Sequence, residues 1–157
     1  MIYLDSNATT QVHPDVLAAM LPYLTDQCYN PSSGYRAGKA VKKAIERARE
    51  QVAKLVGADP EEIVFTGCGT ESNNAALFSL ANAVGNRKRI ITSQTEHSSI
   101  LRVCEQLEGR GYTVERVGVD ESGRLDLEAW KEAVGQEDAG FATLMWANNE
   151  TGVLQPI

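Results

Sequence analysis

The stretch RIITSQTEHSSILRVCEQLEGRGYTVERV, residues 89–117, has the clearest pattern of alternating strand and helix in the chain. It opens with a short apolar run, 89–92, and it closes with a second strand-like run, 113–117. Between them, residues 98–108 have the pattern of a helix that Ser98 or Ser99 can cap. A strand, a helix and a strand in this order predict two parallel strands joined by a right-handed crossover.

The same alternation continues on both sides of this unit. Upstream, Ile63-Val64-Phe65 predicts a buried strand, and residues 73–83 predict a helix. Downstream, residues 127–134 predict a helix with Asp126 in the capping position, and residues 141–146 predict a fourth strand. We therefore expect an α/β protein with a mostly parallel sheet and flanking helices.

Two helices are expected before the first strand. The clearer one covers residues 36–56, where apolar residues recur at three- and four-residue steps, and Gly57 is a good stop. The other covers residues 13–24. Residues 25–38 between them have loop chemistry, with the run Asn30-Pro31-Ser32-Ser33-Gly34.

Composition excludes several classes of protein. The chain has 157 residues, 43% of them hydrophobic, which is enough for one ordinary globular domain and excludes disorder. Its net charge of −6 disfavours nucleic acid as a partner. No apolar run is long enough to span a membrane, and the first residues lack a secretory signal pattern. Three cysteines at unrelated spacings suggest reduced thiols in a cytoplasmic protein, and no Cys/His cluster predicts a metal.

Ligands of parallel sheets bind beyond the carboxyl ends of the strands, where three polar segments follow predicted strands: 66–74, 93–99 and 147–152. The first is a small-residue loop before a helix, which suits a phosphate held by backbone N–H groups and by the hydroxyls of Thr70 and Ser72. It is neither a P-loop nor a Gly-x-Gly-x-x-Gly fingerprint. A plain tight turn with a helix cap explains the same residues equally well.

Single residues in these segments also have two interpretations. His97 can stack on a flat cofactor or move a proton, but a histidine that caps a helix or faces solvent is the commoner case. Of Asn148 and Asn149, one can hold a ligand oxygen, or the pair can form an Asx-type turn. Cys68 lies inside the possible phosphate loop, where a small filler is a better interpretation than a reactive thiol.

Taken together, these segments resemble the N-terminal part of cysteine desulfurases, which are class V aminotransferase relatives among the fold-type I pyridoxal-phosphate (PLP) enzymes. Five motifs fall in the family's order: Tyr3-Leu4-Asp5-Ser6-Asn7-Ala8-Thr9-Thr10, Asn30-Pro31-Ser32-Ser33, Thr66 to Asn74, Thr95-Glu96-His97 and Asn148-Asn149-Glu150-Thr151-Gly152. The resemblance implies that residues 1–14 belong to the small domain of a PLP-dependent transferase. Residues 15–157 would be the first part of its PLP-binding large domain.

The resemblance also implies roles for named residues. Gly69 and Thr70 would bind the PLP phosphate. His97 would stack over the pyridine ring and take part in proton transfer as a catalytic residue. Asn149 would hydrogen-bond the phenolic oxygen of the cofactor and touch the substrate carboxylate. The implied partners are L-cysteine, a second copy of the chain in a homodimer, and an iron–sulfur scaffold or other sulfur acceptor.

The implied reaction converts L-cysteine to L-alanine and leaves the sulfur as an enzyme persulfide that feeds iron–sulfur cluster assembly. No lysine or cysteine of this chain matches the family's Schiff-base lysine or persulfide cysteine, so we expect an N-terminal fragment that is inactive alone. Gly34-Tyr35-Arg36 stands where the family usually has a histidine. The alternatives are another class V enzyme, such as a selenocysteine lyase or an aminotransferase, and a non-catalytic fragment that associates with a missing partner half.

Overall fold

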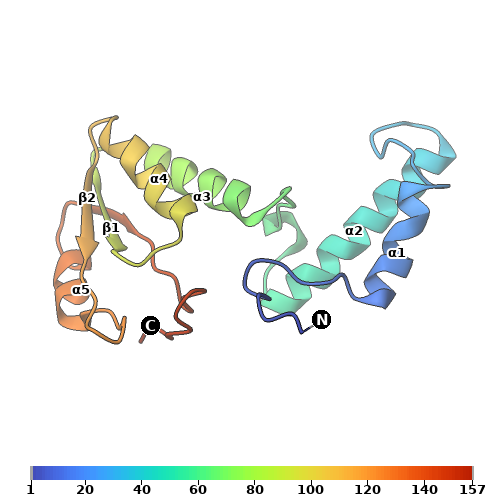
Figure 1. Cartoon of the computed structure of the whole chain (residues 1–157). Coiled ribbons are helices and arrows are strands. Elements are labelled where there is room, and N and C mark those ends of the chain that lie inside the picture. The colour runs from blue at the N-terminus through green and yellow to red at the C-terminus, as the bar shows by residue number, and fades with distance from the viewer. Residues whose placement is uncertain (1, 157) are drawn as a thin grey trace. The chain divides into compact units, whose positions relative to one another are not determined.

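The computed structural model describes residues 2–156, and the chain divides into two compact units, Met1–Phe65 and Thr66–Ile157. The first unit contains helices α1 (Pro14–Leu24) and α2 (Arg36–Val56) and the short 3-10 helix η1 (Pro60–Glu62). The second contains, in chain order, α3 (Gly69–Ala83), β1 (Arg89–Ser93), α4 (Ser98–Glu108), β2 (Thr113–Val117), α5 (Leu127–Val134) and β3 (Ala139–Ala142) (Figure 1). None of the helices in the described part is long and apolar enough to cross a membrane.

The second unit is built on a three-stranded parallel sheet in the order β2-β1-β3. The central strand β1 pairs with β2 in a register that sets Arg89 opposite Thr113 and Ser93 opposite Val117. On its other edge Ile90 lies opposite Phe141. The sheet and its flanking helices confirm the predicted α/β class.

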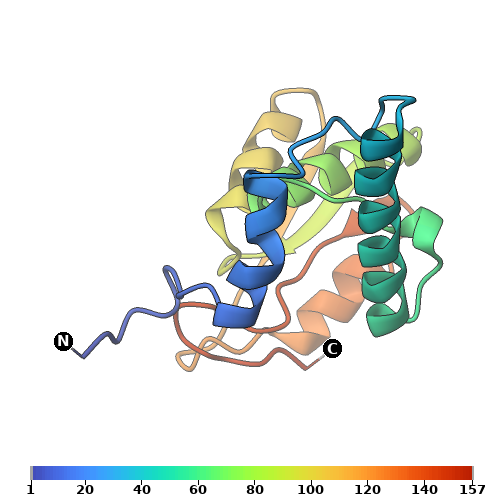
Figure 2. The same cartoon turned by 90° about the vertical axis from the view of Figure 1, so that its right-hand side faces the viewer.

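Helices cover both faces of this sheet. Ile90 is fully buried against α3 and α4, where its partners include Leu77 and Val103. The next residue, Ile91, is fully buried on the opposite face against Leu125 and Ala133. Because successive side chains of a strand point to opposite faces, this alternation produces three layers. Figures 1 and 2 show α3 and α4 on one side of the strands and α5 on the other.

The predicted strand at 63–65 is wrong, because this segment is irregular. Val64 is 77% exposed and Phe65 is 49% exposed. The Ile63 carbonyl accepts a hydrogen bond from Arg49 of α2, whose guanidinium lies over the Phe65 ring, 5.0 Å from its centroid. An apolar run becomes a strand only beside another strand, and none in the described chain pairs with this one.

Two other boundaries differ from the prediction. Helix α3 begins at Gly69 rather than at Asn73, because the helical turn starts directly after the extended residue Cys68. Strand β3 covers 139–142 rather than 141–146. Thr143 N still donates to the Ile91 carbonyl at 2.9 Å, but Met145 N leaves the ladder and donates to the Glu96 side chain in the loop after β1.

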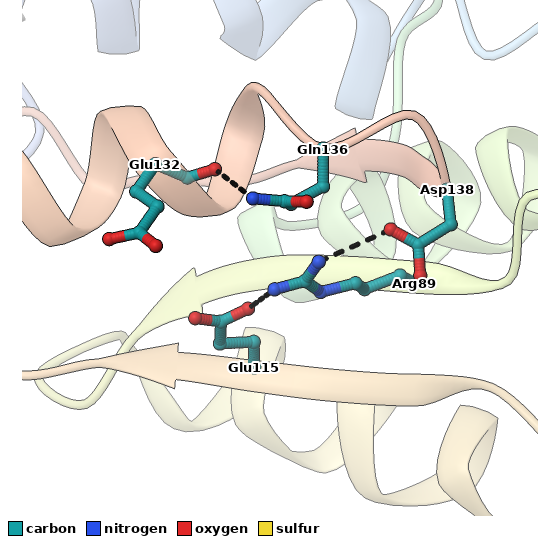
Figure 3. A network of polar contacts seen from close by, with 5 residues as sticks. All are labelled: Arg89, Glu115, Glu132, Gln136 and Asp138. Atoms are coloured by element: carbon teal, nitrogen blue, oxygen red, sulfur yellow. Dashed lines mark hydrogen bonds and ion pairs between the residues drawn. The ribbon is translucent and has the colours of Figure 1, made fainter.

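Arg89, the first residue of β1, links all three strands (Figure 3). Its guanidinium donates to the Glu115 carboxylate on β2 and, at 3.2 Å, to Asp138 just before β3. In the turn before Asp138, the side chain of Gln136 donates to the Glu132 carbonyl at 3.3 Å. These contacts fasten the amino end of the sheet, opposite the edge where its polar loops lie.

Gly140 allows β3 to lie close to β1, and this predicts the effect of a substitution. A Cβ at Gly140 would collide with the Arg87 carbonyl oxygen, whereas a Cβ at Gly118 would meet nothing within 4 Å. We expect Gly140→Ala to lower the free energy of unfolding of the full-length protein by about 1–3 kcal/mol. Urea unfolding measures the change. The matched control Gly118→Ala should stay within about 0.5 kcal/mol of the parent, and equal stabilities for the two variants would contradict the account.

Candidate active site

The amino end of α3 presents backbone N–H groups that make no hydrogen bond to the described residues. Cys68 precedes the helix in an extended conformation and makes no side-chain cap. The first bond of the helix runs from Ser72 N to the Cys68 carbonyl, at 3.2 Å. The N–H groups of residues 69–71 therefore have no acceptor within the described chain. Together with the helix dipole, they form a place that an anion can occupy.

The loop before α3 is held by side chains of the loop and of the first turn of the helix. The Glu71 carboxylate accepts from Gly67 N at 2.6 Å, and the hydroxyls of Thr66 and Ser72 lie 2.6 Å apart. The Ser72 hydroxyl, a second possible phosphate donor in the sequence, is thus bonded to Thr66 in this structure. The Thr70 hydroxyl has no partner in the described chain and stays exposed.

Gly69 leaves open space at this helix start. A Cβ there would meet nothing within 4 Å, so packing within the unit does not require a glycine. Backbone N–H groups without a side chain above them can approach an anion closely. The arrangement of Gly69 and Thr70 is compatible with the predicted phosphate site, and no ligand contact tests it.

His97 is the N-cap of α4, in place of the predicted Ser98 or Ser99. Its Nδ1 atom accepts a hydrogen bond from Ser99 N at 3.1 Å. The ring remains exposed, and it lines a shallow hollow of about 180 Å³ together with Asn73, Glu96, Ile100 and residues 143–145. The helix-cap interpretation of His97 is therefore correct, and the same ring also borders a hollow next to the sheet edge.

Glu96 is a buried carboxylate that was not among the predicted site residues. It is 8% exposed and accepts a hydrogen bond from Met145 N, which draws the segment after β3 toward the end of β1. Burial raises the pKa of the Glu96 carboxyl, whereas hydrogen bonds from the backbone N–H groups of Met145 and His97 act in the opposite direction. Its only signal in the sequence is its position between the strand and His97.

The two consecutive amides after β3 have different environments. Asn148 is buried, and its Oδ1 accepts from the backbone N–H groups of Glu150 and Thr151, both at 2.9 Å. Its Nδ2 donates to the Thr95 carbonyl at 2.9 Å. The Asx-type turn therefore belongs to Asn148. Asn149 is exposed, and its Nδ2 donates to the Glu150 carboxylate at 2.9 Å.

Hydrogen bonds bring the three polar segments to the carboxyl end of β1. Asn73 of α3 donates to the Ser99 hydroxyl at 2.7 Å, and Asn148 reaches Thr95 from the other side. The loop at 93–99 is thus bonded to both neighbouring segments. Of the predicted site residues, only His97 lines the hollow described above, whereas Gly69, Thr70 and Asn149 lie outside its lining.

The described residues contain no cluster of three or more His, Cys, Asp or Glu side chains that could hold a metal ion. Cys28 and Cys68 are exposed free thiols, and Cys104 is buried in the core between α4 and the sheet. Burial raises the pKa of the Cys104 thiol, which keeps it protonated and unreactive.

The second unit combines a parallel sheet, a helix start that can bind an anion and polar loops at one edge. Comparison with known protein families gives an assignment that agrees with these features. The chain matches the class V aminotransferase model over residues 2–157, and it belongs to that family. This confirms the family resemblance seen in the sequence.

Individual relatives point to one branch of the family. The chain and a cysteine desulfurase of Nostoc sp. are 51% identical over 157 residues. The aligned region covers 100% of this chain and 39% of that protein. A solved NifS-like protein superposes with a TM-score of 0.94 at 39% identity, covering 99% of this chain and 43% of that one. A structure of SspA in complex with cysteine gives a TM-score of 0.91 at 36% identity, covering 98% and 44% of the two chains. The chain thus spans less than half the length of these relatives.

The buried Glu96 predicts a pH-dependent difference in stability. Its pKa in the folded state is raised from the ordinary value of 4.5, so ionisation costs the folded state stability as the pH rises through the raised pKa. Glu96→Gln keeps an accepting oxygen for Met145 but has no charge. We expect this variant of the full-length protein to match the parent in acid and to become the more stable of the two toward neutral pH.

Urea unfolding midpoints measured from about pH 4 to about pH 8 test this expectation. Glu96→Ala is the control, because it also lacks the charge but removes the acceptor as well, so its free energy of unfolding should lie about 1–3 kcal/mol below that of Glu96→Gln at every pH. A constant difference between Glu96→Gln and the parent across this range would show that Glu96 does not carry the pH dependence.

Proposed function

We propose that the full-length protein is a PLP-dependent cysteine desulfurase, which converts L-cysteine to L-alanine and retains the sulfur as a protein persulfide. The observation that carries the proposal is the set of unused N–H groups at 69–71, beside the loop of His97, in a class V aminotransferase chain. Relatives that are cysteine desulfurases, and the likeness to SspA in complex with cysteine, support L-cysteine as the substrate.

The chemistry of the donor set fits PLP. A phosphate is an anion, and the start of α3 offers N–H groups, the positive end of a helix dipole and the hydroxyl of Thr70, which no described residue contacts through a hydrogen bond. Gly69 places no side chain in the way. Glu71 is the one carboxylate in the first turn of α3, and the hydrogen bond that it accepts from Gly67 N holds it against the preceding loop rather than at the amides of 69–71.

Four residues have proposed roles toward the cofactor and the substrate. Gly69 and Thr70 would hold the phosphate through backbone N–H groups and a hydroxyl. His97 would lie against the pyridine ring and hold a proton at its imidazole. Asn149 would donate from Nδ2 to the phenolic oxygen and orient the substrate carboxylate. When bound, PLP supplies an electron sink for chemistry at the α-carbon of the amino acid.

The remaining catalytic groups would come from the rest of the full-length protein. The lysines of this chain match no family lysine that would hold PLP: Lys39, Lys42, Lys43, Lys54, Lys88 and Lys131. We further propose, from the family resemblance alone, a cytoplasmic homodimer that passes sulfur to an iron–sulfur scaffold or another acceptor. The assignment of residues 1–14 to the small domain and 15–157 to the large domain is part of the same proposal.

The activity is tested with the full-length protein, PLP and three kinds of substrate. We expect alanine to form with turnover from L-cysteine, and less product from selenocysteine or from an amino donor with a keto acid. Amino acid analysis measures alanine, and sulfide released by a reductant measures the persulfide. Transamination without sulfur release would replace the proposal with an aminotransferase, and preference for selenocysteine would replace it with a selenocysteine lyase.

The isolated 157-residue chain provides a second prediction. With PLP and L-cysteine we expect no alanine above a protein-free control, because no lysine here matches the one that would form the Schiff base. Turnover by the isolated chain would show that the missing lysine is not required or that its position has been misassigned.

The phosphate site provides a third prediction. Thr70→Val removes the hydroxyl and keeps the shape of the side chain, so we expect PLP to bind about tenfold to about a hundredfold more weakly, the range for one hydrogen bond to a charged group. Equilibrium dialysis of the full-length protein measures the affinity for PLP. Thr70→Ser is the matched control and should bind near the parent level. Equal affinity of Thr70→Val and the parent would remove Thr70 from the site.

A further inference from the structure

Three side chains form a hydrogen-bond relay at the carboxyl end of β1, namely Asn73, Ser99 and His97. Asn73 Nδ2 donates to Ser99 Oγ at 2.7 Å. Ser99 Oγ lies 2.7 Å from His97 Nδ1, and Ser99 N also donates to that atom, at 3.1 Å. The relay joins α3 to the first turn of α4.

The direction of this relay follows from its donors. A backbone N–H can only donate, so the lone pair of His97 Nδ1 faces Ser99, and the hydrogen of a neutral ring is on Nε2. Ser99 Oγ accepts from Asn73, and its own hydrogen is therefore available for Nδ1. Each bond polarises the next one in the same direction.

Ser99 differs from the adjacent Ser98 in burial and in its hydrogen bonds. Ser99 is 6% exposed, whereas Ser98 is exposed and has no such partner in the described chain. A buried hydroxyl without partners would lower the stability of the protein. The Ser99 hydroxyl has both an acceptor and a donor, since it accepts from Asn73 and can donate to His97. The His97 ring is exposed, so its orientation depends on what holds Nδ1 rather than on packing.

We propose that Ser99 and Asn73 are positioning residues, which hold the His97 ring in one orientation with its hydrogen on Nε2. This inference rests on the proposed function, because it gives the ring that would lie against PLP a fixed face and a fixed proton. Asn73 acts only through Ser99. The Ser99 backbone N–H donates to the capping atom His97 Nδ1 in any variant, and the Ser99 hydroxyl is the part that makes the ring orientation unique.

The test uses four variants of the full-length protein: Ser99→Ala, Asn73→Ala, the double variant and Ser99→Thr. One hydrogen bond contributes about 0.5–1.5 kcal/mol, so we expect each alanine variant to change the ratio of the two neutral His97 tautomers by about threefold to about tenfold. NMR of the two ring nitrogens in protein labelled with ¹⁵N-histidine and free of PLP measures this ratio. His97→Gln identifies the resonances.

The kinetic arm measures kcat for alanine formation. We expect a decrease of about threefold to about tenfold in both single alanine variants and no further decrease in the double variant, since Asn73 acts through Ser99. Ser99→Thr retains a hydroxyl and should recover most of the loss. Asn82→Ala is the matched control, because Asn82 is an exposed amide on α3, the helix that also carries Asn73. This variant should leave both the tautomer ratio and kcat at the parent level.

The outcomes separate this inference from the proposed function. Parent-level tautomer ratios in both Ser99→Ala and Asn73→Ala would overturn the positioning role, and so would additive losses in the double variant. A parent protein that binds no PLP or forms no alanine would overturn the proposed function, and the NMR arm would then decide the inference by itself. A changed tautomer ratio that disappears in Ser99→Thr would support it.

Discussion

The central strand of the sheet is the constraint on which the second unit depends. Strand β1 is buried from Ile90 to Ser93 and pairs in parallel along both edges. A parallel strand has to be covered on both faces, which α3 and α4 do at Ile90 and α5 does at Ile91. Since all three strands run in the same direction, their carboxyl ends meet at one edge. The direction of the strands alone therefore places the loops that follow the strands at this edge.

Side chains then fasten this edge to the loop at 93–99. Glu96 receives Met145 N, Asn148 reaches the Thr95 carbonyl, and Ser99 binds the amide of Asn73. A buried polar group without a partner costs a protein about 1–3 kcal/mol, and each of these groups has a partner. The polar residues at the edge thus hold the loops in place. Among the described residues, the groups available to a ligand are the N–H groups of 69–71, the Thr70 hydroxyl and the exposed His97 ring, and the exposed Asn149 amide also donates to Glu150.

Local signals predicted the helices well. The ranges 36–56, 98–108 and 127–134 agree with the structure, because apolar periodicity and glycine stops lie within the helices and beside them. The strand expected at 63–65 failed because strand pairing depends on distant residues that a short apolar run does not reveal. For the candidate site, the sequence placed His97, Asn148 and Asn149 beyond the carboxyl ends of the strands, and the structure has them there. The sequence did not reveal which of Asn148 and Asn149 closes the turn, and it did not reveal that Glu96 is buried. Both answers depend on residues far away in the chain, since Asn148 bonds to Thr95 and Glu96 bonds to Met145.

The central claim is that the phosphate of PLP occupies the start of α3. A crystal structure of the full-length protein with PLP tests it most directly. The account predicts phosphate oxygens within hydrogen-bond distance of the backbone N–H groups of Gly69 and Thr70, with the His97 ring against the pyridine. A phosphate bound elsewhere, or the Glu71 carboxylate occupying those N–H groups while PLP is bound, would contradict it.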